Sequence, residues 1–196
     1  MLSENGLRVP VALWEFDEEA PIRAVLHRLK YQNHPWIGRH LGIELGTSGL
    51  PPFDEVWDCI VPIPLHRLRL LERGYNQSEW IARGLAETLG LPLMKRALTR
   101  TRETAPQTSL ARHLRRSNVM GAFRASQACD LSGRRVLLVD DTLTTGATLE
   151  SAAQVLLSAG AVTVQPVAVA RAALRLEKEQ GGPASVIGSR PSLFSI

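Results

Sequence analysis

The sequence predicts an α/β fold in which a parallel sheet is flanked by helices, and two observations lead to this fold class. Short apolar runs typical of buried strands, at residues 56–61, 135–139 and 162–170, alternate with segments of helical periodicity. Such alternation is typical of a parallel sheet covered on both faces. The chain has 196 residues, of which 44% are hydrophobic and 21% charged, enough for one domain with an apolar core.

Four helices are expected from the spacing of apolar residues and from end signals. The first begins near Pro21 and the second near Pro35, because proline suits the first turn of a helix. The third begins at Asn76, which together with Glu79 matches a capping box. The fourth covers residues 148–159, where small and apolar residues recur at helical spacing.

Two further strands are expected, at residues 91–98 and 119–123. The first apolar run leads into Pro-Ile-Pro at residues 62–64, which cannot continue a central strand because proline lacks the backbone donor. Residues 99–117 form a long basic loop without periodicity, and such a loop in a compact domain is usually functional or mobile. From about residue 178 the chain turns to Gly, Pro and Ser, so a weakly ordered tail is expected.

Composition narrows the class of protein. No apolar run approaches the roughly 20 residues that span a bilayer, and residues 1–10 lack a secretory signal, so a cytoplasmic protein is expected. The only cysteines, Cys59 and Cys129, make neither a disulfide framework nor a four-ligand zinc site. Residues 66–116 carry 11 Lys and Arg against 4 Asp and Glu. This segment either attracts an anion or is a solvated basic face.

The most informative run is VLLVDDTLTTGAT, at residues 136–148. A buried strand delivers Asp140 and Asp141 to its carboxyl end, where ligands bind in open α/β sheets. A loop of small hydroxyl residues with Gly146 follows, and then a helix begins. Backbone N–H groups of such a loop and the helix N-terminus attract phosphate, and Gly146 lets the backbone approach it.

The two carboxylates would repel a phosphate that touched them. They suit a position one sugar-length away, where they accept hydrogen bonds from a vicinal diol or hold Mg²⁺. Adjacent strand residues point to opposite faces, so one of Asp140 and Asp141 is expected to contact the ligand more directly, and the sequence does not say which.

The sequence lacks the motifs of several other classes of binding site. It contains no Gly-x-x-x-x-Gly-Lys loop, which excludes a P-loop NTPase, and no Gly-x-Gly-x-x-Gly after a strand. A phosphoacceptor receiver domain would need a further Asp on a later strand, but Asp141 is the last aspartate of the chain. The remaining alternative is a helix after a strand, with Asp and Thr as ordinary caps.

Residues 136–148 closely resemble the ribose-phosphate loop of type I phosphoribosyltransferases. Further segments resemble one branch of these proteins, the ComF family of competence-associated proteins, with RGYNQ as the segment that points to this branch. The matching segments are residues 29–31 (LKY), 61–66 (VPIPLH), 73–77 (RGYNQ), 107–110, 116–119, 121–123 and the Asp-Asp loop. Many members begin with a zinc-binding cluster of cysteines, but residues 1–20 contain no cysteine, so no zinc is expected.

The resemblance implies a type I phosphoribosyltransferase-like parallel sheet flanked by helices. It implies a small N-terminal helical hood at residues 1–55, a core at residues 56–175 and the tail at residues 176–196. It assigns Asp140 and Asp141 to the ribose hydroxyls and Mg²⁺. It assigns the 5′-phosphate of phosphoribosyl pyrophosphate to the loop residues Thr144, Thr145, Gly146, Ala147 and Thr148.

The resemblance also places residues 62–73 at the pyrophosphate loop. Arginine suits a diphosphate because its fork binds two oxygens. The segment supplies Arg67, Arg69 and Arg73, and Arg73 is the best candidate. Arg112 lies in the basic loop, which in this superfamily closes over the substrate.

Each candidate near these segments also has a plain structural reading. Arg73 is either a ligand or an exposed arginine at a helix start, and Asn76 either reaches the ligand or caps its helix. His66 is expected to be an ordinary loop residue. Lys30 is expected to stabilise the end of a helix through the helix dipole.

Three functions fit the sequence. The first is transfer of a phosphoribosyl group to an unidentified acceptor. The second is binding of a phosphoribosyl ligand without turnover. The third, implied by the ComF resemblance, is binding of single-stranded DNA or DNA-uptake proteins, although the basic segment at residues 66–116 has few aromatic residues for base stacking.

Overall fold

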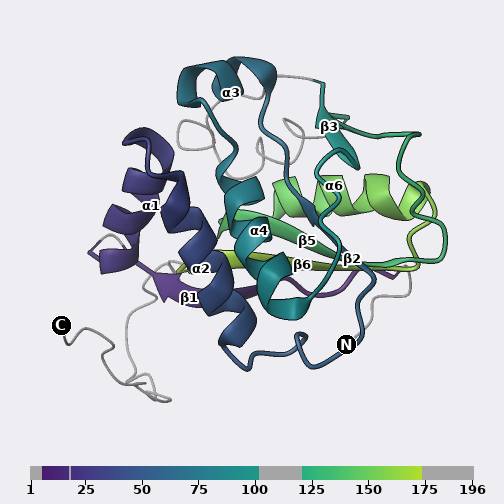
Figure 1. The fold of residues 1–196 in the computed structure, drawn as a ribbon, viewed down its shortest axis with the longest axis horizontal. Helices are drawn as coiled ribbons and strands as arrows, with labels where there is room; N and C mark the ends of the chain where they lie inside the picture. Colours follow the sequence, from purple (N-terminus) through teal and green to yellow (C-terminus); the bar gives the residue numbers. More distant parts are fainter. Residues whose placement is uncertain (1–5, 18, 102–120, 174–196) are drawn as a thin grey trace, which may run out of the picture.

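A four-stranded parallel sheet forms the centre of the computed structural model, which describes residues 6–17, 19–101 and 121–173 (Figure 1). The strands lie in the order β1 (Val11–Phe16), β6 (Thr163–Ala172), β5 (Arg135–Leu143) and β2 (Cys59–Pro62). All three pairs of neighbouring strands are parallel. The predicted α/β fold with a parallel sheet is therefore confirmed.

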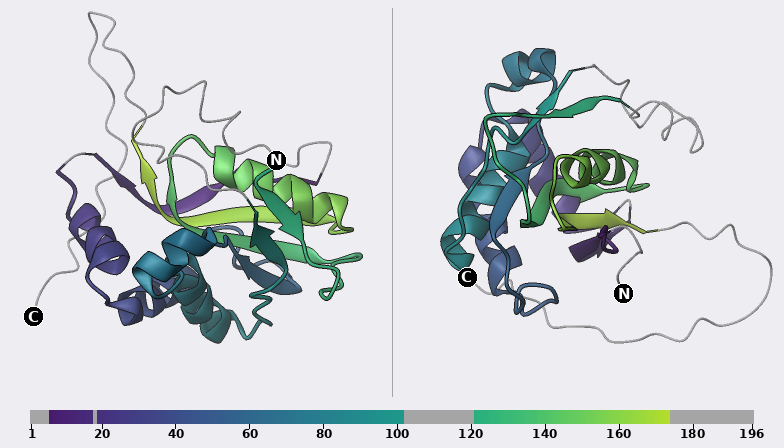
Figure 2. Two further views of the ribbon diagram at one scale, coloured as in Figure 1. Left: turned by 90° about the horizontal axis from the view of Figure 1, so that it is seen from above. Right: turned by 90° about the vertical axis from the view of Figure 1, so that its right-hand side faces the viewer.

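Helices cover both faces of this sheet (Figure 2). One face carries α1 (Pro21–Tyr31), α2 (Pro35–Thr47) and α4 (Gln77–Leu89), and the other carries α6 (Ala147–Ser158). The short helix α3 (Arg67–Arg73) buries none of its residues. A small antiparallel pair, β3 (Leu98–Arg100) and β4 (Phe123–Ala125), lies beside the main sheet.

Strand β5 divides the apolar core into two clusters. Val136 and Leu138 pack with α6, whereas Leu137 and Val139 pack with α1, α2 and α4. This alternation follows from the two-residue period of a strand. Because all four side chains are fully buried, β5 is held from both sides, and its carboxyl end is fixed with it.

Helices α2 and α4 approach each other at backbone level. A Cβ atom added to Gly84 would lie 1.9 Å from the carbonyl oxygen of Arg39, and one added to Gly42 would lie 1.9 Å from that of Ile81. No other residue type fits such an approach without a shift of backbone, so the two glycines set the distance between the helices.

The helices expected at Pro21, Pro35 and Asn76 are confirmed, and the fourth begins one residue earlier than expected. The strand expected at residues 91–98 is wrong, because apart from Leu98 in β3 only Leu93 forms a bridge, to Ile60. Of the expected capping box, the Asn76 cap is confirmed and the Glu79 cap is wrong. Asn76 accepts from the backbone N–H of Ser78, whereas the Glu79 carboxylate pairs with Arg83 and Lys95.

Two elements were absent from the sequence-based expectation. Helix α3 lies within the segment expected to be a loop, and it has no buried residue. Strand β1 arises from the segment expected to form the hood, and its residues are only partly buried. The division of the chain at residues 55 and 175 stays a prediction.

Some expectations lie outside the described residues. These are Arg112, most of the basic loop, the strand start at residue 119 and the C-terminal tail. Among the helices that the structure describes, none is both long and apolar enough to cross a membrane.

Candidate functional site

The predicted acidic pair lies at the carboxyl end of β5, one of the two inner strands of the sheet. Both side chains are nearly inaccessible, since Asp140 is 8% and Asp141 5% exposed. Two adjacent buried carboxylates need partners, because an unpaired charge in the protein interior is costly. The structure gives each of them a different partner.

Asp140 contacts the start of α4. Its Oδ1 atom accepts a hydrogen bond from the Ser78 hydroxyl at 2.9 Å and another from the backbone N–H of Asp141 at 2.9 Å. Burial, followed by repulsion from Asp141, raises the pKa of Asp140 to about 7. Asp140 therefore exchanges its proton near neutral pH.

Asp141 contacts the end of α1. The Lys30 ammonium lies 2.5 Å from its Oδ2 atom and donates a further hydrogen bond to the Thr142 hydroxyl at 3.3 Å. Burial favours a raised pKa, but the charge and hydrogen bond of Lys30 outweigh it and lower the pKa of Asp141. The same ion pair outweighs burial at Lys30 and raises its pKa. At neutral pH this pair is therefore an ammonium and a carboxylate.

Residues 73–77, the RGYNQ segment, join α3 to α4 directly before Ser78, the residue that contacts Asp140. Arg73 donates to the Gln77 side chain, and its guanidinium lies 5.4 Å from the centre of the Tyr31 ring. The Tyr75 hydroxyl donates to the Leu29 carbonyl. Asn76 caps α4, so the expected capping role is confirmed. Its side-chain amide also donates to the Ile63 carbonyl.

The Thr and Gly loop leads from β5 into α6. Gly146 occupies the position before the helix with φ of 80°, a conformation that favours glycine. Thr145 accepts a hydrogen bond from the backbone N–H of Ala147 at 3.4 Å. The first backbone N–H groups of α6 face this loop, as they do at any helix start. The loop thus has the backbone that an anion site requires.

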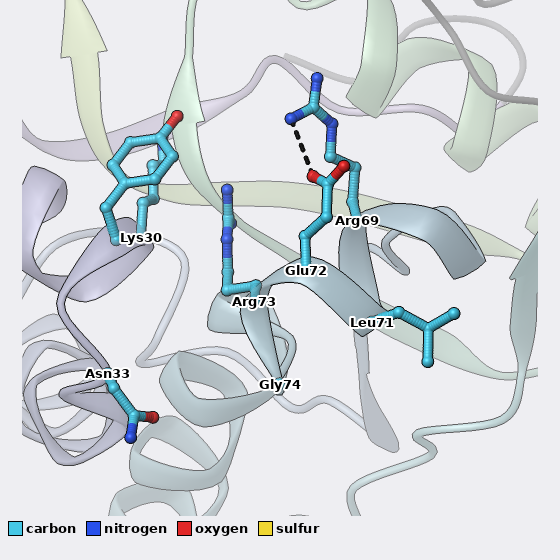
Figure 3. Close-up of a pocket in the computed structure, with 8 residues that line it drawn as sticks. Lys30, Asn33, Arg69, Leu71, Glu72, Arg73 and Gly74 are labelled. Atoms are coloured by element: carbon cyan, nitrogen blue, oxygen red, sulfur yellow. Dashed lines mark hydrogen bonds and ion pairs between the residues drawn. The ribbon is translucent and has the colours of Figure 1, made fainter.

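A pocket of about 440 Å³ opens between α3 and the end of α1 (Figure 3). The side chains of Arg69, Glu72 and Arg73 extend toward the same side, and Arg69 pairs with Glu72 at 3.2 Å. Its lining is made of Lys30, Tyr31, Asn33, Arg69, Leu71, Glu72, Arg73 and Gly74. Lys30 therefore joins this pocket to the acidic pair.

The predicted site residues are only partly brought together. Asp140, Asp141 and residues 144–148 form one continuous edge, and Arg73 lines the neighbouring pocket. Arg67 is exposed at the first turn of α3 and does not line that pocket, and Arg73 ends α3 instead of starting a helix.

Sequence reasoning missed two partners of the acidic pair. Ser78 follows the RGYNQ segment directly, and Lys30 lies in the LKY segment, where only a helix-end role was expected. One signal was available. The LKY segment, the RGYNQ segment and the Asp-Asp loop all belong to the same family resemblance, which indicates that they lie close together in the fold.

Comparisons with a family model and with solved structures each found similar proteins. A family model described as "Phosphoribosyl transferase domain" matches residues 49–188. Among solved structures, the glutamine phosphoribosylpyrophosphate amidotransferase from B. subtilis is similar over 72% of this chain and 30% of its own. It has 23% sequence identity and a TM-score of 0.48.

Curated relatives are more similar in sequence. The "DNA utilization protein YhgH" of Escherichia coli O157:H7 is 37% identical over 157 residues, 76% of this chain and 66% of the relative. The "Competence protein F" of Haemophilus influenzae is 32% identical over 78% of this chain and 69% of the relative. The chain thus spans about two thirds of the length of these relatives. It belongs to the ComF family of proteins with a phosphoribosyl transferase domain.

Proposed function

We propose that this protein binds phosphoribosyl pyrophosphate together with Mg²⁺ and transfers the phosphoribosyl group to an acceptor, in the cytoplasm. The observation that carries the proposal is the buried pair Asp140 and Asp141 at the carboxyl end of β5, followed by the loop at residues 144–148 and the start of α6. Carboxylates can accept hydrogen bonds from a ribose diol, and the backbone N–H groups at a helix start can bind a phosphate, so this succession suits the two halves of a ribose phosphate.

In the proposed complex the loop residues Thr144 to Thr148 bind the 5′-phosphate through backbone N–H groups and hydroxyls. The acidic pair accepts hydrogen bonds from the ribose hydroxyls. Arg73 and Arg69 line the neighbouring pocket and bind the pyrophosphate end, for which a guanidinium fork is suited.

The donor set fits a Mg²⁺ ion that arrives with its ligand. Mg²⁺ is usually held by one or two carboxylates together with phosphate oxygens and water. Asp140 and Asp141 supply two carboxylates, and the part of the chain that the structure describes contains no group of three or more acidic, His or Cys residues suited to a metal. When bound, Mg²⁺ would neutralise charge on the diphosphate.

Transfer requires no protein nucleophile. The bond from ribose C1 to the pyrophosphate oxygen breaks, and the electron pair leaves with pyrophosphate. The acceptor then forms the new bond at C1 and loses its proton. Positioning and charge stabilisation therefore supply the catalysis, with the arginines acting on the leaving group.

Calorimetry with phosphoribosyl pyrophosphate, with and without Mg²⁺, tests the binding step. The double variant Asp140→Asn with Asp141→Asn should lose binding while it keeps its fold. Unchanged affinity in this variant would remove the basis of the proposal. Pyrophosphate release against a panel of acceptors tests the transfer step, and tight binding with no release would leave a ligand-binding protein without turnover.

A second candidate is a role in DNA uptake through single-stranded DNA, and the names of the relatives favour it. The structure adds a specific surface at the end of α1 and the start of α2. Tyr31 is 65% and Trp36 57% exposed there, and Trp36 lies against His34 and His40. Exposed aromatic rings stack on bases with little sequence preference.

Fluorescence titration with an oligothymidylate at rising salt tests the second candidate. Trp36→Ala should weaken binding, because stacking on an aromatic ring contributes about 1–3 kcal/mol per base. Val162→Ala, at an exposed position after α6, is the matched control. Equal affinity of the Trp36 variant and the control would exclude this surface.

A further inference from the structure

We infer that the Lys30 ammonium occupies the position at Asp141 where Mg²⁺ would bind, and that binding of Mg²⁺ there displaces the ammonium. The displaced ammonium then binds an anion in the pocket beside α3. The inference deepens the proposed function and rests on it for the identity of the ligand. The contacts of Lys30 support this inference, which couples the acidic pair to the neighbouring pocket beside α3.

The Lys30 ammonium already occupies the metal side of the acidic pair. It lies 2.5 Å from Asp141 Oδ2 and also binds the Thr142 hydroxyl, and the Asp141 side chain is 7% exposed. A divalent cation bound at this oxygen would lie beside the ammonium, and the two cations would repel each other. Binding of Mg²⁺ at Asp141 Oδ2 therefore favours movement of Lys30 away from it.

The pocket gives the displaced ammonium a place to go. Lys30 lines it and one quarter of its side chain is exposed, so the residue borders the pocket while its ammonium is paired with Asp141. Lysine has a flexible four-carbon stem, which lets the ammonium swing while the helix stays in place. Within the described lining the charged groups are Lys30, Arg69, Glu72 and Arg73, and Glu72 pairs with Arg69.

Movement of Lys30 adds a cation to a pocket that already favours an anion. The Arg73 guanidinium is held in the pocket wall by Gln77 and Tyr31. An anion bound there stabilises the ammonium in its displaced position, and this leaves Asp141 available to Mg²⁺. By linkage, Mg²⁺ and the anion must each raise the affinity for the other by the same factor.

Calorimetry with Mg²⁺ alone tests the first step. Lys30→Met should bind Mg²⁺ about tenfold more tightly than the unaltered protein, since an opposite charge this close to a carboxylate typically shifts proton affinity by at least that factor. Lys30→Gln is the second variant, should the first not fold. Lys95→Met is the matched control, because Lys95 is also paired with a carboxylate, that of Glu79 at 3.1 Å.

Inorganic phosphate, which binds Mg²⁺ only weakly in solution, tests the coupling. In the unaltered protein phosphate should raise Mg²⁺ affinity severalfold, and in both Lys30 variants this increase should vanish. Mg²⁺ affinity that is equal in all proteins, or coupling that persists in the Lys30 variants, would overturn the inference.

The outcome is separable from that of the proposed function. Tighter Mg²⁺ binding by the Lys30 variants without any binding of phosphoribosyl pyrophosphate would refute the proposed function and support the exchange. Binding of phosphoribosyl pyrophosphate with unchanged Mg²⁺ affinity in those variants would support the binding step of the proposed function and refute the exchange.

Discussion

Replacement of Asp140 by Asn should stabilise the protein above neutral pH while it weakens the site. The carboxyl of Asp140 is buried beside Asp141, and its pKa is raised from an ordinary 3.8 to about 7. Between these two values the folded protein holds a proton that the unfolded chain has released. The free energy of unfolding therefore falls as pH rises through this window.

The size of the effect follows from the shift. A raised pKa of about 7 against 3.8 is about three units, and each unit corresponds to about 1.4 kcal/mol. The upper bound is therefore about 4 kcal/mol, and relaxation around Asp140 reduces it toward about 2 kcal/mol. An asparagine oxygen keeps the hydrogen bonds from Ser78 and from the backbone N–H of Asp141, so the substitution removes chiefly the charge.

Urea denaturation at several values between pH 4.5 and 8 measures this difference. The variant should exceed the unaltered protein by about 2–4 kcal/mol at pH 8, and the gain should shrink toward pH 4.5. Asp58→Asn is the contrasting control. Hydrogen bonds from Arg135 lower the pKa of Asp58, so its loss should destabilise at neutral pH and matter less in acid. An Asp140 variant that is less stable at pH 8 would refute the reasoning.

Three further substitutions test the surrounding frame. Gly84→Ala should lower the free energy of unfolding by about 1–3 kcal/mol, because the new Cβ atom meets the Arg39 carbonyl; a gain in stability on urea unfolding would contradict this. Asn76→Ala should cost about 1–2 kcal/mol, since it removes a helix cap and a second hydrogen bond, and thermal unfolding measures the loss. Tyr75→Phe leaves the Leu29 carbonyl without its donor and should cost about 1–3 kcal/mol, whereas an unchanged melting temperature would show that the bond adds nothing.

Local sequence patterns predicted the elements that bury whole faces. The strand at residues 135–139 is a continuous apolar run because both of its faces are buried, and the helix after Asn76 repeats apolar residues at helical spacing because it buries one face. Helix α3 buries none of its residues and β1 is only partly buried, and neither element was predicted. The strand expected at residues 91–98 failed because apolar residues there pack as single contacts along an irregular segment.

The candidate site shows the same limit. The acidic pair and the loop of residues 144–148 are contiguous in sequence, so their chemistry could be read directly. The partners of the pair come from distant segments. Ser78 lies 62 positions from Asp140, and Lys30 lies 112 positions from Thr142, which it also contacts. A local pattern carries no information on such contacts, and only the fold brings these residues together.

The position of β1 affects how this protein can be divided for experiments. The strand pairs with β6 from residue 11 to residue 16, although the two are far apart in sequence. A cut near residue 55 would remove β1 and leave β6 as an unpaired edge, a template on which a second molecule can add a strand. A shortened protein that begins at residue 56 is therefore expected to aggregate, and binding studies should retain the N-terminal strand.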